Sequence, residues 1–373
     1  MKHTMIKISA LSAGILSASA VMAGGFDNSS RGFDIIYGDN NVITTSYGQT
    51  AVPMKAKIQQ GSGNPSSVVA SGEIIDDFQR PQLGVRYNIA ENVTCATQYE
   101  VPFEAGVAYK DDSLSYANSA TDIKSAPIST NYNSKSLTVA CGYDMSLSTG
   151  SMKVFGGPKI QQVKGSFDED ITPNDAADND NLLVELDGGT EAGYILGLAY
   201  EIPDIALRAS ILYHSQIDYT ATGTNKTYLP LSLLGMSDEI VTADAKAKTF
   251  TPQTIEIAFQ SGIAENTLAF LKMRWSEYSK LATLSVKADE STKVSTGTTL
   301  AQINQIAQAN GSTAFDSLIN PEVSMFSNDT LDYSFGLGRR FSDQLTLGAS
   351  FSGSIKLGGK SDDTPVGADS TSL

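Results

Sequence analysis

Apolar and polar residues alternate along much of this chain, in segments about ten residues long. Between 205 and 214 the odd positions are apolar, while Arg208, Ser210 and His214 stand at even positions. The same period of two runs through three further segments, 93–101, 331–338 and 345–352. Side chains two residues apart share one face of an extended strand, so each segment predicts a strand with one apolar face and one largely polar face.

The connections between the expected strands alternate between short and long. We expect strands at 42–53, 80–89, 93–103, 133–145, 151–165, 191–202, 205–221, 248–263, 267–282, 330–342 and 345–357. The short connections are 90–92, 146–150, 203–204, 264–266 and 343–344, and the long ones are 54–79, 104–132, 166–190, 222–247 and 283–329. Outer-membrane barrels have short turns at one end and long loops at the other, and about ten residues suffice for a strand to cross a bilayer.

A secreted β-sandwich would also alternate, but it has no reason to keep this rhythm of connections. We therefore predict an all-β fold, an antiparallel up-and-down transmembrane β-barrel. Single-chain bacterial barrels use an even number of strands, whereas eleven are counted here and residues 359–373 are polar and loop-like. Either the strand count is wrong or the barrel, over 42–373, lacks its last strands.

The first 23 residues resemble a secretory signal peptide. Lys2 and Lys7 precede an apolar run over 8–21, and small residues lead to a cleavage site after Ala23. The alternative is a transmembrane anchor, but the run is shorter than the roughly 20 apolar residues that span a bilayer. No later segment is as apolar over a comparable length, so a membrane crossing after Ala23 would have to use strands.

Composition and charge narrow the classes of function. The net charge of −15 argues against nucleic acid, because phosphates need a basic face. Cys95 and Cys141 have the same parity on neighbouring expected strands and should both face lipid. A disulfide between them is possible in a secreted protein, while two separate small apolar residues is the alternative that we favour slightly.

Neither a catalytic nor a metal site is indicated. His214 is the one histidine after Ala23, and Ser210 lies about 13 Å away along an extended strand at about 3.3 Å per residue, too far for a nucleophile and its base. The acidic segment 168–187 lacks the glycine spacing of a calcium loop and is best explained as solvated. We expect no enzyme activity, no metal and no cofactor.

Several framework motifs resemble alphaproteobacterial members of the FadL family of outer-membrane fatty-acid transporters. Near the N-terminus they are Gly24-Gly25-Phe26, Ser30-Arg31-Gly32 and Asp34-Ile35-Ile36-Tyr37. Further along they are 193–203 with 205–208, 262–264 through Arg274-Trp275, and 336–341. The resemblance covers most of the chain after Ala23 but rests on framework residues rather than on chemistry.

This resemblance implies a barrel of fourteen strands with an N-terminal plug, here 24–41. It also implies a hydrophobic capture groove built by external loops, and lateral release of the ligand through a kinked strand. The Asn-Pro-Ala motif of the family's plug is not found before the first expected strand. Residues 156–158, Gly-Gly-Pro, would kink their strand, because proline removes a donor from the ladder.

A path for a fatty acid needs apolar surface for the tail, which two loops offer. One contains Tyr228, Leu229, Leu231, Leu233, Leu234 and Met236, and the other contains Leu300, Ile303 and Ile306 at helical spacing. The two apolar sets form either a ligand groove or a lid in which they pack on each other, and both can hold.

The carboxylate of a fatty acid needs a cation or another donor. Parity places five cations on the inner face: Arg86, Arg208, Lys272, Arg274 and Arg340. Glu100, Glu201, Glu256 and Asp332 are expected as their partners, so most of these cations should be structural.

We therefore expect a protein of the bacterial outer membrane that passively transports hydrophobic small molecules such as long-chain fatty acids. Its partners would be that ligand and outer-membrane lipids, and the protein would be a monomer. The alternatives are a structural or surface-interaction barrel and a diffusion porin for polar solutes. A porin needs an open polar channel, whereas a transporter of this kind needs an apolar pocket.

Overall fold

The computed structural model describes residues 32–38, 40–50, 55–59, 68–73, 78–108, 116–118, 123–173, 181–281, 283–324, 328–342 and 345–357. The expected signal peptide and the polar tail, 359–373, lie outside these residues. Within them, no helix is both long enough and apolar enough to cross a membrane.

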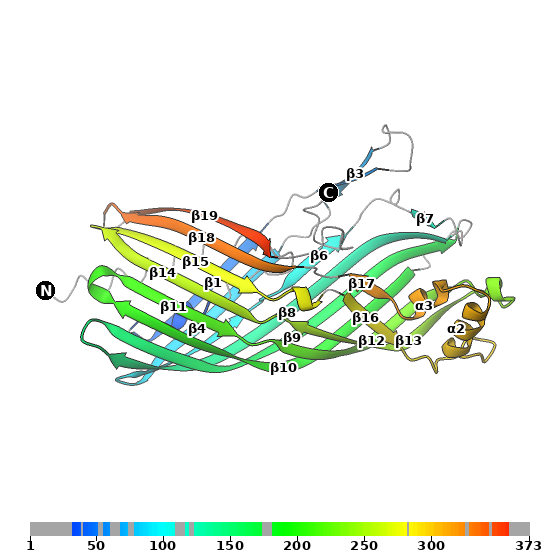
Figure 1. Cartoon of the computed structure of the whole chain (residues 1–373), viewed down its shortest axis with the longest axis horizontal. Coiled ribbons are helices and arrows are strands. Elements are labelled where there is room, and N and C mark those ends of the chain that lie inside the picture. Colours follow the sequence, from blue (N-terminus) through cyan, green and yellow to red (C-terminus); the bar gives the residue numbers. More distant parts are fainter. Residues whose placement is uncertain are drawn as a thin grey trace.

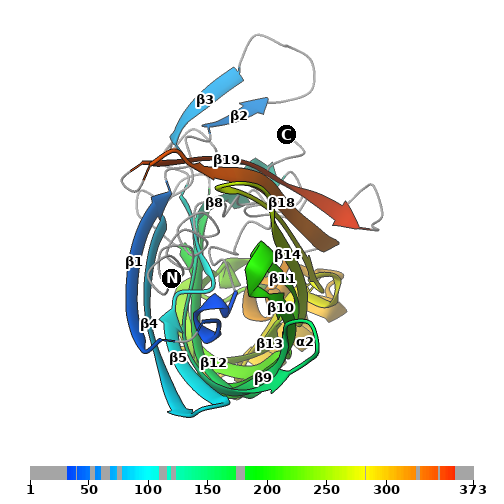
Figure 2. The ribbon, with the colours of Figure 1, turned by 90° about the vertical axis from the view of Figure 1, so that its left-hand side faces the viewer.

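Antiparallel strands form one curled wall (Figures 1 and 2). Going round the wall, these are β1 (Val42–Thr50), β4 (Phe78–Ala90), β5 (Val93–Glu100), β8 (Ile123–Ser146), β9 (Ser151–Pro173), β10 (Asn181–Ile202), β11 (Leu207–His214), β14 (Thr254–Ala264), β15 (Thr267–Ser276), β18 (Asp329–Arg340) and β19 (Thr346–Leu357). Among the described residues, no register joins β19 to β1. The predicted all-β antiparallel barrel fold is confirmed.

One end of the wall carries the short turns, and the other, the loop end, is extended by further strands. These are β12 (Ile217–Leu229), β13 (Glu239–Thr251), β16 (Thr283–Ala288) and β17 (Glu322–Ser324), with β6 (Glu104–Ala108) and β7 (Tyr116–Asn118) paired to β8. A separate hairpin joins β2 (Lys55–Gln59) and β3 (Val68–Glu73). The helices are η1 (Asp34–Ile36), η3 (Pro203–Ile205), η4 (Leu231–Leu234), η5 (Ser279–Leu281), α2 (Leu300–Ala309) and α3 (Ala314–Ile319).

In the lower wall, which runs to the short turns, the outward side chains are apolar. On β18, Phe335 and Leu337 are exposed, whereas Ser334 is buried on the opposite face. On β14, Ile257 is exposed and Glu256 is buried. Apolar side chains that face outward and polar ones that face inward are what a bilayer requires of a strand.

Where β11 continues into β12, the apolar positions of the sequence change sides. His214 ends β11 and Ile217 begins β12, and both side chains are buried, so Ser215 and Gln216 add one residue to the alternation. Beyond this bulge Tyr219 is buried and Asp218 is exposed. The odd positions, which face outward on β11, therefore face inward on β12.

The neighbouring strands change sides at the same level. Thr251 at the end of β13 and Thr254 at the start of β14 are both buried, with Pro252 and Gln253 between them. On β10 the register shifts between Asp187 and Gly189, which moves the inward positions from even to odd numbers. The loop end thus has an apolar interior and a polar exterior, as a soluble protein does.

Several segments that were predicted to be loops are strands, because the strands continue beyond the bulges into the loop end. Residues 166–190 and 222–247 consist mostly of the upper parts of β9, β10, β12 and β13. The segment 283–329 holds β16, β17 and both α-helices. The predicted strands 205–221 and 267–282 are each interrupted, at 215–216 and after Ser276. Alternation predicts strands wherever it occurs, but the length criterion for crossing a bilayer says nothing of strands that continue into water.

Cys95 and Cys141 are direct register partners on β5 and β8, and they form a disulfide with a Cα–Cα distance of 4.0 Å. The slight preference for two separate residues was wrong. Parity alone shows that two cysteines share a face, but only the register brings them opposite each other.

Replacing both cysteines, Cys95→Ala with Cys141→Ala, should lower the free energy of unfolding. The bond joins residues 46 apart, for which the loss of chain entropy in the unfolded state corresponds to about 4 kcal/mol. Heat-dependent mobility on a denaturing gel, which separates folded from unfolded barrels, checks this for the oxidised protein, the reduced protein and the variant. Equal unfolding temperatures for all three would contradict it.

The turn between β12 and β13 is held by one carboxylate. Asp238 accepts hydrogen bonds from the Ser232 hydroxyl at 3.1 Å, from the Ser232 amide, and from the Tyr228 hydroxyl at 2.9 Å. Burial alone would raise the pKa of Asp238, but these hydrogen bonds outweigh it and lower the pKa below its ordinary value. The ionised carboxylate therefore stabilises η4.

Asp238→Asn should loosen this turn, because the amide lacks the charge that strengthens all three bonds. A lowered pKa means that the stabilisation is present above the ordinary aspartate pKa of about 3.9 and is lost as the pH falls through the lowered value. Hydrogen exchange of the Ser232 amide, corrected for its intrinsic rate, should be several-fold faster in the variant and in the wild type at acid pH. Asp244→Asn, on the exposed face of β13, is the control and should leave this amide unchanged.

Candidate ligand-binding path

The segment before β1 lies inside the wall, where η1 is the short blue coil in Figure 2. Phe33, Ile36 and Tyr37 are buried there, and both aromatic rings contact Phe155 of β9, at centroid distances of 6.4 and 5.8 Å. The cluster continues to Ile195 and Ala199 of β10, and to Ala96, Ala140 and Leu212 of β5, β8 and β11. The described part of the expected plug, 32–38 and 40–41, thus fills the interior near the turn end.

The wall holds this segment by its backbone carbonyl oxygens. Arg86 Nε donates to the Asn40 oxygen at 2.7 Å, Lys153 Nζ to the Ile36 oxygen at 3.0 Å, and Gln98 Nε2 to the Gly32 oxygen at 3.0 Å. Each buried charge thereby finds acceptors, as burial demands. Arg86, one of the five expected inner cations, is an anchor of this segment.

The other four expected inner cations also have partners. Arg208 pairs with Glu201 and stands 4.2 Å from the Tyr37 ring centroid. Lys272 pairs with Glu256 at 2.8 Å and Arg274 with Asp332 at 2.9 Å. Arg340 donates to Asn266 Oδ1 at 2.9 Å near the turn end.

Two lysines that the sequence analysis did not select also lie on the inner face. Lys153 pairs with Asp144 at 3.1 Å, and Lys159 with Glu100 at 3.5 Å. His214 lies in one register row with Thr254 and Ser276, and all three side chains are buried on the inner face. The middle of the interior is therefore polar and its charges are neutralised.

Nearer the loop end the interior becomes apolar. The buried side chains there are Val163, Leu182, Val184, Ile217, Tyr219, Ala245, Ala247 and Val286, from β9, β10, β12, β13 and β16. This lining exists because of the bulges, which turn the apolar positions of β10, β12 and β13 inward.

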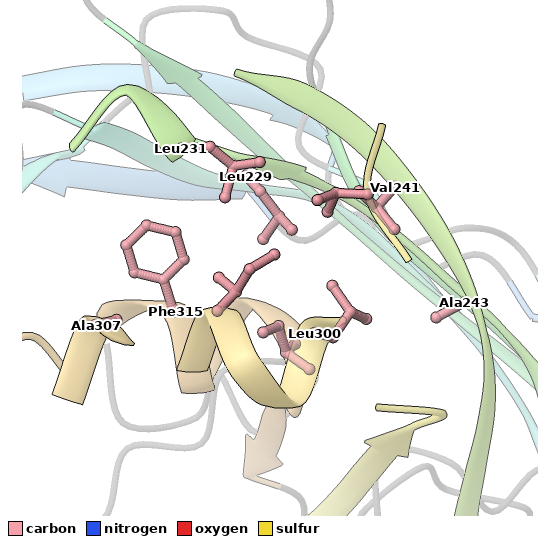
Figure 3. Packing of buried hydrophobic residues seen from close by; sticks show 10 residues of the cluster. Leu229, Leu231, Val241, Ala243, Leu300, Ala307 and Phe315 are labelled. Carbon is pink, nitrogen blue, oxygen red and sulfur yellow. The ribbon is translucent and has the colours of Figure 1, made fainter. Parts of the chain in front are cut away.

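The two apolar loops of the sequence analysis meet above this lining (Figure 3). Leu229 and Leu231, from β12 and η4, pack against the apolar side of α2 and against α3; the buried residues of these helices are Leu300, Ile303, Ala307, Phe315 and Ile319. Tyr228 is also buried, and Leu234 and Met236 are partly buried. We call this cluster the lid.

Two of the expected groove residues remain on the surface of the lid. Leu233 is 59% exposed and Ile306 is 41% exposed, although both are large and apolar. The packing of the remaining members accords with the lid alternative, and the exposed pair is the part that could still meet a ligand.

Asparagine side chains tie the lid to the wall. Asn225 of β12 donates to the carbonyl oxygens of Leu318 at 3.2 Å and Ile319 at 2.9 Å. Asn320 accepts from the Ala288 amide and donates to Asp316, both within 3.2 Å. Helix α2 starts at a capping box, in which the side chains of Thr299 and Gln302 bind each other's backbone amides.

The wall is discontinuous between β4 and the upper part of the next strand. The register of β4 with β5 ends at Gln82–Glu100, and β6 then pairs with β8. Pro102, which lacks a donor, lies in the interruption. Across this gap the Gln79 amide donates a hydrogen bond of 3.3 Å to Glu104 Oε2.

The kink that Gly156-Gly157-Pro158 predicts does not break β9, which keeps its register with β10 throughout these residues. On the other side, the register with β8 skips Val139 and Ala140. A Cβ on Gly157 would lie within 2.0 Å of the Val139 oxygen, so glycine is needed there for close approach of the strands.

Of the acidic residues in 168–187, Asp168, Glu169 and Asp170 lie on β9 and Glu185 and Asp187 lie on β10, whereas 174–180 lie outside the described residues. Lys164 pairs with Asp187 at 2.7 Å on the surface. No group of three or more His, Cys, Asp or Glu side chains that could hold a metal ion occurs in the part of the chain that the structure describes.

The sequence analysis missed Arg80, because the expected strand began at that residue. The structure begins β4 at Phe78, so Arg80 is inside the strand with the parity of Arg86. Extending the alternation back from Arg86 would have placed both arginines on the inner face.

The family model described as outer membrane protein transport protein (OMPP1/FadL/TodX) matches residues 28–349. A solved FadL homologue from Pseudomonas aeruginosa is similar, with 15% identity, a TM-score of 0.54, and coverage of 84% of this chain and 69% of that one. The toluene transporter TodX from Pseudomonas putida shares 11% identity, with a TM-score of 0.46 and coverage of 84% and 73%. No protein of curated function matches the chain.

The family match spans most of the chain, and the fold agrees with that of the solved homologue. Proteins of this family are outer-membrane β-barrels of Gram-negative bacteria, and they are transporters of hydrophobic compounds rather than enzymes. The chain therefore belongs to the FadL/TodX family of outer-membrane transport proteins.

Proposed function

We propose that this chain transports long-chain fatty acids or similar hydrophobic molecules, which enter at the lid and leave sideways into the bilayer. The observation that carries this proposal is the group of buried apolar side chains at the loop end, which adjoins the lid through Leu318. An apolar tail gains about 25 cal/mol for each Å² of surface that it removes from water. Passage is passive and follows the concentration gradient of the ligand.

The exit that we propose is the gap between β4 and β6. A continuous ladder cannot open without exposing backbone donors and acceptors to lipid, which costs several kcal/mol for each group. At this gap the ladder already ends, and Pro102 has no donor to leave unsatisfied. A ligand could pass here at a smaller cost than through a continuous ladder.

A diffusion porin fits less well, because the described residues 32–38 and 40–41 pack inside the wall and inner charges such as Lys272 and Arg274 are paired. A purely structural barrel gives no reason for exposing two large apolar side chains, Leu233 and Ile306, on the lid. These alternatives predict no saturable binding of a fatty acid.

Purified protein in detergent should bind hexadecanoate saturably, and Leu233→Asp with Ile306→Asp should weaken that binding about tenfold, since burying part of two large apolar side chains contributes about 1 to 2 kcal/mol. Leu231 and Ile303 are unsuitable targets because they are core residues of the lid, and a charge there would unfold it. Titration with a fluorescent fatty acid measures the dissociation constant.

Thr242→Asp, on the exposed face of β13, is the matched control and should bind as the wild type does. Absence of saturable binding by folded wild-type protein would refute the transport proposal. Unchanged binding by the double variant would refute capture at the lid.

Locking the gap should block exit without blocking capture. Gln79→Cys with Glu104→Cys introduces a thiol on each of the two residues that now meet across the gap through the Gln79 backbone amide and the Glu104 carboxylate. Fatty-acid uptake into liposomes should fall at least fivefold when this pair is oxidised and recover on reduction, because the exit is then tied shut. The control is Thr45→Cys with Leu83→Cys, register partners on β1 and β4, where the ladder is complete. Undiminished uptake by the verified cross-linked protein would exclude this gap as the exit.

A further inference from the structure

Nearly every cation on the inner face has an acceptor that neutralises it. Carboxylates serve Lys153, Lys159, Arg208, Lys272 and Arg274, and backbone oxygens serve Arg86. A carboxylate ligand that bound to one of these groups would have to displace a partner that is already in place.

Arg80 is the exception among the residues that the structure describes. Its Nε is buried and has no hydrogen-bond partner, and Arg80 takes part in none of the ion pairs among the described residues. The register shows which face of β4 carries the Arg80 side chain. The strand runs without a shift from Arg80 to Gly84. A Cβ added at Gly84 would lie 2.3 Å from Ile35 of the interior segment, so this face of β4 is the inner one. Arg80 therefore faces the interior.

The groups around Arg80 leave its guanidinium able to bind an anionic ligand. Its guanidinium lies over Gly48, the register partner on β1, where an added Cβ would lie 3.3 Å from Nε. Glu100 is paired with Lys159, and Glu104 accepts from the Gln79 amide across the gap. Both nearby carboxylates thus have other donors.

Arg80 also stands beside the proposed exit. Gln82, two residues along β4 on the same face, is the last residue of the ladder with β5 before the gap. A half-buried guanidinium without a counter-charge is costly, and its planar fork matches the two oxygens of a carboxylate.

We propose that Arg80 binds the carboxylate head of an amphipathic ligand while the apolar tail passes through the gap between β4 and β6. This inference rests on the proposed function and adds to it that an anionic head is selected at the exit. A lipid phosphate from the surrounding bilayer offers similar oxygens, and the test separates the two sources.

The test compares hexadecanoate with hexadecanol, which has the same tail and a neutral head, on the wild type, Arg80→Gln and Arg80→Lys. Arg80→Gln should weaken hexadecanoate binding about tenfold or more, as expected for the loss of charged hydrogen bonds, and leave hexadecanol binding within about twofold. Arg80→Lys should restore part of the loss, because it keeps the charge but not the fork. Arg339→Gln, an exposed arginine on the outer face of β18, is the control and should change neither ligand.

Hexadecanol binding also reports that each variant is folded. Equal losses for both ligands, or none for hexadecanoate, would overturn the role of Arg80 while leaving transport intact. If Arg80→Gln instead changes only the amount of phospholipid that copurifies, the head group is a lipid phosphate and the carboxylate proposal fails. Failure of the wild type to bind either ligand would refute the proposed function itself.

Discussion

The structure depends on the need to satisfy backbone amides and carbonyls where no water can reach them. In hydrocarbon each unpaired group costs several kcal/mol, so the lower wall consists of ladders that run from β4 to β19 with few shifts of register. Above that level water is available again, and the strands accordingly bend, bulge and separate. The positions where a ladder ends are therefore the positions where neighbouring strands can separate at the lowest cost.

A single extra residue changes what the interior can hold. Ser215-Gln216 in one strand and Pro252-Gln253 in the next reverse the faces of an otherwise regular alternation. Below them polar side chains face inward and pair with one another, and above them apolar side chains do so. The same sequence pattern thereby serves an aqueous environment at the loop end and a lipid environment in the lower wall.

The strand positions of the lower wall and the inner face of its arginines could be predicted, because a period of two fixes both. The disulfide could not, since it depends on the register between two strands that are 46 residues apart at Cys95 and Cys141. The reversal of faces at 215–216 was missed because the odd positions are apolar on both sides of it, over 205–213 and 217–221. The lid was foreseen as one of two alternatives from composition, but which members are exposed, Leu233 and Ile306, depends on packing.

The disulfide lies in the ladder of β5 with β8, below the point where β5 gives way to β6. It joins one flank of the gap covalently to β8, so under the proposed function a ligand that passed there would displace β4 rather than β5. Any widening of the gap between β4 and β6 would therefore come from movement of β4. The gap could then open for a ligand while the ladder of β5 with β8 stays paired, so that local opening would not lead to unfolding of the barrel.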